Sequence, residues 1–128
     1  MVVQDFGGAH DVNGDAEMEA ILATRYGQGV NEIWLTHEGH EYPAILILAN
    51  GELACVHYFP EEFDPGYQSV GTKQGVDPEG STTFFVNTPT EPVYVLNTAI
   101  VPFSLACQAA KEFSKSSKLP RCIEWFRL

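Results

Sequence analysis

The segment that most constrains the fold is YPAILILANGELACVHYF, residues 42–59. Its two apolar runs, 44–48 and 53–59, are rich in residues that favour β-strands, and they flank Asn50 and Gly51. This pair accepts the positive φ angles that both central residues of a two-residue hairpin turn require, so the segment predicts two antiparallel strands. Because both runs are almost continuously apolar, we expect both faces of the hairpin to be covered, with the hairpin at the centre of a sheet.

A helix is expected on each side of this hairpin along the chain. The first lies in DVNGDAEMEAILATRYGQG, residues 11–29, where Asn13 or Asp15 is the expected N-cap and Gly27 the expected stop. The second covers 102–117, because a proline fits the first helical position and the lysines lie late in the segment, where cations complement the helix dipole.

The remaining strand signals are short. Residues 31–37, NEIWLTH, alternate in polarity as a half-buried strand does, and YQSV, TTFFVNT and EPVYVLN have strand composition between turn residues. The order predicts an α+β domain in which a largely antiparallel sheet of about six or seven strands packs against an N-terminal and a C-terminal helix. We expect a single domain made of an N-terminal segment and helix (1–29), the antiparallel sheet (30–100), a helix (102–117) and a closing C-terminal strand (121–126).

Length and cysteine content indicate a small protein of a reducing compartment. A chain of 128 residues can bury one real core. No apolar run is long enough to span a bilayer, and the first residues lack the basic and apolar regions of a signal peptide. The three cysteines are odd in number and form no C-x-x-C, so they predict neither a disulfide framework nor a zinc knuckle. We expect a cytoplasmic protein that does not bind membranes.

Charge is the most informative bulk property. Seven Lys and Arg residues against 17 Asp and Glu residues give a net charge of −10. Residues 1–110 hold 15 of the acids and only two basic residues, whereas the remainder is basic. Because phosphate backbones attract Lys and Arg, this distribution argues against direct nucleic-acid binding and favours a basic protein partner. Solubility alone is the alternative explanation.

Patterns for catalysis are absent from the sequence. HEGHEY places His37 and His40 three residues apart beside a glycine, whereas the zinc-protease motif needs H-E-x-x-H on a helix. There is no G-x-S-x-G elbow and no phosphate-binding loop. We therefore expect no catalytic residue, no metal and no cofactor. The alternative is a small hydrolase or metal-dependent enzyme with His37, Glu38 and His40 as its ligands, which metal analysis of the purified protein would reveal.

The loop that follows the central hairpin is the candidate binding site. Residues 56–71, VHYFPEEFDPGYQSVG, interleave aromatic rings with carboxylates between two prolines. Aromatic residues supply contact area at low entropic cost, and carboxylates pair with Arg or Lys. A second acidic segment, 77–79, is expected to flank it at the same end of the sheet. The candidate partner-binding residues are Tyr58, Phe59, Glu61, Glu62, Phe63, Asp64, Tyr67, Asp77 and Glu79.

Four stretches between residues 30 and 126 together resemble a known protein family. They are YPAILILANGELACVHYF, FDPGYQSVG, PVYVLN and VPFSLACQAAKEFSKSSKLPRCIEW. In this order they resemble a bacterial polymorphic-toxin immunity family, which includes the inhibitor of the double-stranded-DNA cytosine deaminase toxin. The features are a paired central hairpin, a short strand with Ser-Val-Gly, a helix started by proline, and a final Pro-x-x-x-x-Trp. Residues 1–29 lie outside the resemblance.

The resemblance implies a non-enzymatic inhibitor. Such a protein binds a cognate secreted toxin domain and covers its active site, and a toxin that acts on nucleic acid has a basic substrate groove. A nucleic-acid deaminase is the first expectation for the toxin, and a nuclease would suit the same charge. The remaining alternative is a generic acidic interaction module without a toxin. The gene next to this one would decide, because an immunity protein should lie beside a large secreted protein with a C-terminal toxin domain.

Overall fold

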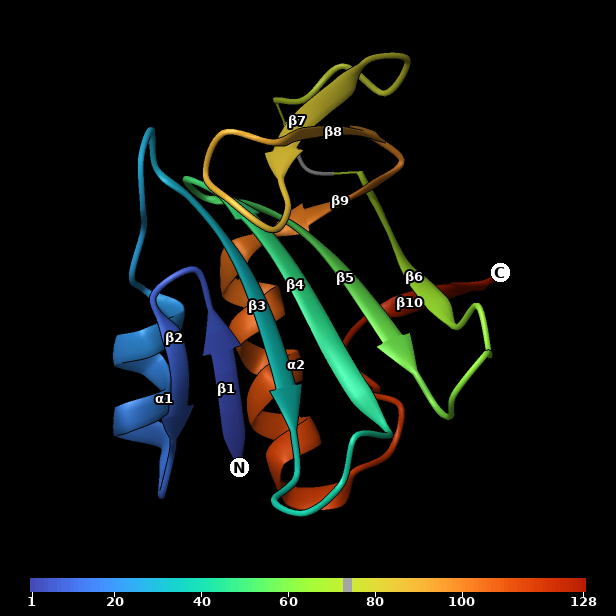
Figure 1. The fold of residues 1–128 in the computed structure, drawn as a ribbon. Helices are drawn as coiled ribbons and strands as arrows, with labels where there is room; N and C mark the ends of the chain where they lie inside the picture. Colours follow the sequence, from blue (N-terminus) through green and yellow to red (C-terminus); the bar gives the residue numbers. More distant parts are fainter. Residues whose placement is uncertain (73–74) are drawn as a thin grey trace.

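An eight-stranded sheet runs through the computed structural model, which describes residues 1–72 and 75–128 (Figure 1). The strand order across the sheet is β10-β6-β9-β5-β4-β3-β1-β2. Neighbouring strands pair antiparallel except β6 and β9, which are parallel. In chain order the strands are β1 (Val2–Asp5), β2 (Gly8–Asp11), β3 (Val30–Thr36), β4 (Ala44–Asn50), β5 (Leu53–Phe59), β6 (Tyr67–Thr72), β9 (Ala99–Pro102) and β10 (Glu124–Arg127).

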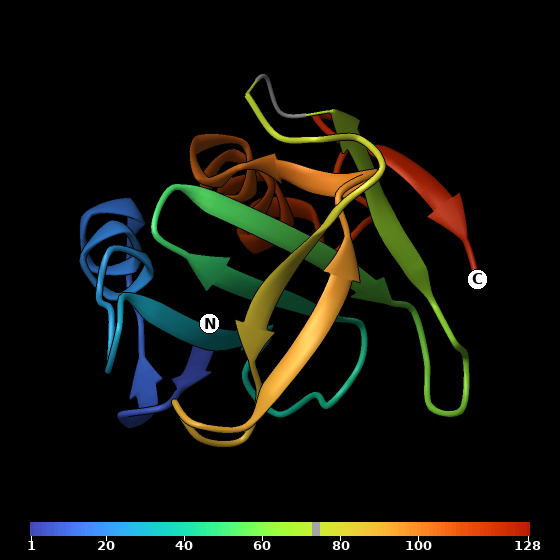
Figure 2. The ribbon, with the colours of Figure 1, turned by 90° about the horizontal axis from the view of Figure 1, so that it is seen from above.

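Other elements cover the two faces of this sheet unequally. Helices α1 (Asp15–Leu22) and α2 (Phe103–Ser116) lie on one face, which we call the helix face. A separate two-stranded hairpin of β7 (Ser81–Phe85) and β8 (Pro92–Leu96) crosses part of the other face. Figure 2 shows the sheet between the helices on one side and this hairpin on the other.

The central strands β4 and β5 are covered on both faces, as their apolar runs predict. In β4, Ile45 and Ile47 belong to the core under the helices, whereas Leu46 and Leu48 pack toward the β7–β8 hairpin. Successive side chains of a strand point to opposite faces, so a continuously apolar strand can only be stable between two layers. Fully burying one such side chain contributes about 1.5–3 kcal/mol. The expectation of a central, doubly covered hairpin is therefore confirmed.

The turn between β4 and β5 has two residues, but it lies one position later than predicted. Asn50 pairs with Leu53, so the central residues are Gly51 and Glu52. Only Gly51 of these two has a positive φ, at 57°. This is the pattern of a type II′ turn, which needs glycine at the first central position, and the expected positive φ at both Asn50 and Gly51 was wrong.

Both helices form where they were expected, with different ends. The residue before α1 is Gly14, which offers no side-chain cap, and the helix ends at Leu22 rather than near Gly27. α2 begins at Phe103, directly after β9, and its last turn is closed by Ser117 in the left-handed conformation. Ion pairs from lysines of α2 to acids of α1 join the two helices: Lys111 contacts Glu19, and Lys115 lies 3.6 Å from Asp15.

The described part of the chain contains ten strands, eight of them in the main sheet, so the expected six or seven was too few. Three strands were missed: β1 and β2 in the N-terminal segment before the first helix, and β9 directly before the second helix. Each has only four residues, too short a run for polarity to reveal a period. Among the described helices, none has the length and apolar character needed to cross a bilayer.

Candidate binding site

The segment predicted as a binding site, residues 56–71, includes the end of β5, the loop 60–66 and most of β6, and this loop projects beyond the ends of both strands (Figure 1). At its tip Phe63 is 95% exposed and adopts a positive φ of 65°, which is costly for a bulky residue. Glu61 and Glu62 beside it are also exposed. The tip therefore presents one apolar ring and two carboxylates to solvent.

The base of the 60–66 loop is held to the last strand by an ion pair. Both carboxylate oxygens of Asp64 accept from Arg127, at 2.5 and 2.9 Å, and Asp64 Oδ1 also accepts from the backbone N–H of Gly66 at 2.7 Å. The guanidinium lies 4.6 Å from the centre of the Tyr67 ring. These hydrogen bonds, the one from Arg127 above all, lower the pKa of Asp64. Asp64 thus fixes the loop from within the protein.

The other aromatic residues predicted for the site are buried or half-buried. Tyr58 is buried in the core of the helix face, where its hydroxyl donates to the backbone oxygen of Ser117 at 3.2 Å. Tyr67 is half-buried beside it, with ring centres 6.0 Å apart. Phe59 lies half-buried on the opposite face of the sheet, stacked on Trp34. These rings support the loop, and only Phe63 is presented by it.

The second acidic segment lies away from this loop. Asp77 and Glu79 are exposed, and the Asp77 carboxylate accepts from the Glu79 backbone N–H at 3.0 Å in a local turn. The segment follows β6, whereas the 60–66 loop precedes it, so the two lie toward opposite ends of that strand (Figure 1). The expectation that both flank the same end of the sheet was wrong.

A cleft of about 540 Å³ opens on the face of the sheet opposite the helices. We call it the sheet cleft. It lies over β1 and β3, where the β7–β8 hairpin does not cover the sheet. Its lining combines three aromatic rings, three acidic residues and several uncharged polar side chains: Val2, Gln4, Asp5, Phe6, Glu32, Trp34, Thr36, His40, Glu41, Tyr42, Ala44 and Asn87.

Strand register fixes the floor of the sheet cleft. Gln4 of β1 lies opposite Trp34 of β3. The Trp34 ring stacks on Phe59, with centres 5.7 Å apart and planes at 27°. At one end the Glu32 carboxylate accepts from the backbone N–H of Asn87 at 3.1 Å, which ties β3 to the β7–β8 turn. The loop 37–43 closes the other end, because it joins the paired ends of β3 and β4.

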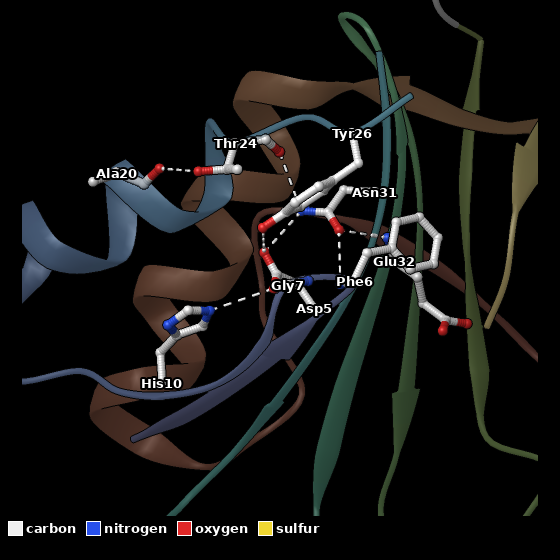
Figure 3. A network of polar contacts seen from close by, with 9 residues as sticks. All are labelled: Asp5, Phe6, Gly7, His10, Ala20, Thr24, Tyr26, Asn31 and Glu32. Carbon is white, nitrogen blue, oxygen red and sulfur yellow. Dashed lines mark hydrogen bonds and ion pairs between the residues drawn. The ribbon is translucent and has the colours of Figure 1, made fainter. Parts of the chain in front are cut away.

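Behind the cleft, a buried carboxylate organises the edge of the sheet (Figure 3). The Asp5 side chain is only 1% exposed. It accepts from the Gly7 backbone N–H at 2.8 Å, from Asn31 Nδ2 at 3.2 Å and from the Tyr26 hydroxyl at 3.4 Å, and it lies 3.4 Å from His10 Nε2. Burial and the nearby Asp5 charge raise the pKa of Tyr26. The network joins the β1–β2 turn to β3 and to the segment after α1.

The residues that could support catalysis are dispersed or buried. Burial raises the pKa of Cys55 to about 11, which leaves its thiol protonated, and burial lowers the pKa of neighbouring His57. His37 Nε2 lies 3.1 Å from the backbone oxygen of Phe113. Within residues 1–72 and 75–128, no three His, Cys, Asp or Glu side chains are grouped as a metal site would require.

Glu32, Trp34 and the rest of the sheet cleft were not predicted as a site. The signal was present in NEIWLTH, because its alternation places an acid and a tryptophan on the side of the strand away from the core. A single outward aromatic residue is common on protein surfaces, so this signal by itself did not identify a site. No protein-family model matches this chain, and a search of curated proteins finds no match.

Proposed function

We propose that this chain is an immunity protein, which binds a cognate secreted toxin domain in the cytoplasm and inhibits it by covering its active site. The toxin acts on nucleic acid, with a cytosine deaminase as the first candidate. The observation that carries the proposal is the 60–66 loop, whose exposed tip joins an apolar ring to two carboxylates while its base is fixed by Asp64 and Arg127. The resemblance of residues 30–126 to immunity proteins supports the same function.

Charge supports a basic partner. The protein has a net charge of −10, and three of its seven basic residues are paired with acids of the same chain: Lys111, Lys115 and Arg127. An enzyme that acts on nucleic acid carries positive charge along its substrate groove. An acidic inhibitor is steered toward that groove and competes there with phosphate, without binding nucleic acid or a membrane itself.

Preorganisation of the 60–66 loop supports tight binding. Ordering a flexible loop on binding costs affinity, whereas a loop already held by hydrogen bonds loses little further freedom. Gly66 lets the loop pack closely against β5, because a Cβ at this position would lie only 2.5 Å from the backbone oxygen of Tyr58. An exposed aromatic residue on a rigid support has the character of an interface hot spot, and Phe63 fills that role.

An immunity protein should have a toxin domain encoded beside its gene, and the test is binding of the chain to that domain. Replacing Glu61 and Glu62 by Lys should weaken binding at least about tenfold and reduce the salt dependence of the association rate, because close charge pairs at inhibitor interfaces couple by roughly 1.5–7 kcal/mol. Phe63→Ala should weaken binding to a similar degree. Asp64 is left intact, since its loss would release the loop. Protection of toxin-expressing cells should fall in parallel.

The matched control is Asp11→Lys with Glu38→Lys, which reverses two exposed charges elsewhere. All variants should melt close to the parental temperature, because substitutions at exposed positions change stability by no more than about 0.5 kcal/mol. If the loop variants bind and protect as well as the parent, or if the control weakens binding equally, the 60–66 loop is not the binding surface.

A further inference from the structure

We infer that the sheet cleft is a second binding site, which takes an arginine side chain from an extended segment of a protein partner. The inference deepens the proposed function and rests on it, because the arginine belongs to the same basic partner. The cleft adds to the 60–66 loop a concave contact on a different part of the sheet.

The charge of the cleft selects a cation. Two carboxylates lie near its ends: Glu32 on β3, and Glu41 on the loop that follows this strand. Asp5 also lines the cleft, but its side chain is occupied by the buried network described above. Among the described residues that line the cleft there is no lysine or arginine to neutralise these acids. The imidazole of His40 also lines the cleft. A cationic group entering the cleft would therefore meet carboxylates that no lysine or arginine of the lining neutralises.

The aromatic floor selects a flat cation. Trp34 stacks on Phe59, which fixes the position of its ring, and it stands two residues from Glu32 on the same face of β3. Residues at this spacing are roughly 6.6 Å apart along a strand. A guanidinium can lie on the indole and direct two N–H donors at the neighbouring carboxylate, which an ammonium on a flexible stem does less well. Tyr42, which is 38% exposed, is another aromatic ring of the lining.

The size of the cleft fits a side chain together with part of its backbone. Its volume of about 540 Å³ lies within the roughly 300–1,000 Å³ of ligand pockets. The outward residues of β3 run from Glu32 to Thr36, a length of about 13 Å, which suits a short extended segment. Glu32 uses one oxygen for the Asn87 backbone N–H, and its Oε2 has no partner among the residues the structure describes. That oxygen is free to accept from the guanidinium.

The experiment is an NMR titration of the full chain, with the indole N–H of Trp34 as the reporter. The probe is acetyl-Gly-Arg-Gly-amide. The comparison probes replace arginine by lysine or by citrulline, which has nearly the same shape without the charge, and spermidine tests for a polyamine site. We expect saturable shifts with arginine, at least about fivefold weaker binding with lysine, and no saturation with citrulline.

Variants locate the site. Glu32→Gln keeps an oxygen for the Asn87 N–H but removes the charge, and it should weaken arginine-peptide binding at least about fivefold. Glu41→Gln should weaken binding to a smaller extent. Glu38→Gln is the matched control, because it removes the same charge from the same loop at a residue outside the cleft lining, and it should change nothing. Equal binding of citrulline, tighter binding of spermidine, or equal effects of Glu38→Gln and Glu32→Gln would overturn the inference.

The same variants separate this inference from the proposed function. If Glu32→Gln leaves toxin binding unchanged while the loop variants weaken it, the arginine site is wrong and the immunity function stands. If the arginine peptide binds as expected but the neighbouring toxin domain is not bound, the proposed function fails and the cleft must serve another basic protein.

Discussion

The two faces of the central sheet use the same strands in different ways. On the helix face, β3, β4 and β5 contribute apolar side chains to a core closed by α1 and α2. On the other face the β7–β8 hairpin covers β4 and β5, but it leaves part of β3 and β1 open. The closed face holds the fold together. The open face carries the acid Glu32, which a closed core would not accept unpaired, and the half-buried Trp34, which packs at the margin of the apolar cluster under the hairpin.

The largest difference between the faces should appear in core truncations. Phe113 of α2 is fully buried on the helix face, so Phe113→Ala should cost about 3–5 kcal/mol of unfolding free energy. Trp34→Leu on the open face should cost no more than about 1.5 kcal/mol. Urea denaturation measures both values. Equal losses would show that the open face is as much a part of the core as the helix face, and Phe113→Leu provides a milder variant if the alanine variant does not fold.

The next largest loss of unfolding free energy should come from the buried Asp5 network, which lies near the β1–β2 edge of the sheet. Asn31→Leu removes two donated hydrogen bonds, one to Asp5 and one to the backbone oxygen of Thr24. It leaves a buried carboxylate with fewer partners, which should cost about 2–4 kcal/mol. Double substitution with Asp5→Leu should recover part of this loss. Additive losses in that double variant would show that the two residues do not act together.

The turn between the central strands should be less sensitive to substitution than Phe113 or the Asp5 network. Gly51 has a positive φ, and a Cβ there would meet nothing within 4 Å, so Gly51→Val is opposed by backbone strain alone. We expect a loss of about 1–3 kcal/mol, measured by thermal unfolding. Gly51→Asn is the control, because asparagine tolerates this conformation better. An unchanged melting curve for the valine variant would contradict the type II′ turn.

The smallest loss of stability should come from the Asp64–Arg127 ion pair at the β10 edge of the sheet, and this loss should depend on pH. The folded protein lowers the pKa of Asp64 from its ordinary value of 3.8, mainly through Arg127, so the folded state favours the charged carboxylate. This stabilisation is complete above about pH 5 and is lost as the pH falls below 3.8 through the lower folded value. Asp64→Asn should therefore melt earlier than the parent at pH 7, and the difference should disappear at low pH. A difference that persists at low pH would mean that Arg127 does not hold this carboxylate.

The elements that sequence analysis predicted well are those in which burial follows a simple pattern. The run from Ala44 to Leu48 is apolar at every position, and it lies between two layers as expected. We predicted the turn after this run one residue too early, because Asn50 and Gly51 both favour turns. Only the pairing of Asn50 with Leu53 decides that Gly51 and Glu52 are the central residues. The four-residue strands were missed because their stability comes from pairing with distant strands, which local composition does not record.

The candidate site was predicted only in part, for a related reason. Composition identified the acids and aromatic residues of the 60–66 loop, but it could not show that Tyr58 points into the core or that Asp64 meets Arg127 from the far end of the chain. The sheet cleft joins residues of β1, β3 and two loops, which become neighbours only in the folded chain. Trp34 alone gave a sign of it, as an aromatic residue on the outward side of an alternating strand.

The central proposal is that this acidic chain inhibits a toxin domain, and one measurement tests it most directly. If a large secreted protein is encoded beside this gene, its C-terminal domain is purified, and the catalytic activity of that domain on nucleic acid is titrated with the chain at low and at physiological salt. We expect complete inhibition at a one-to-one ratio, with nanomolar or tighter affinity that weakens as salt rises. Full toxin activity in the presence of excess chain, with no complex detected at either salt concentration, would contradict it.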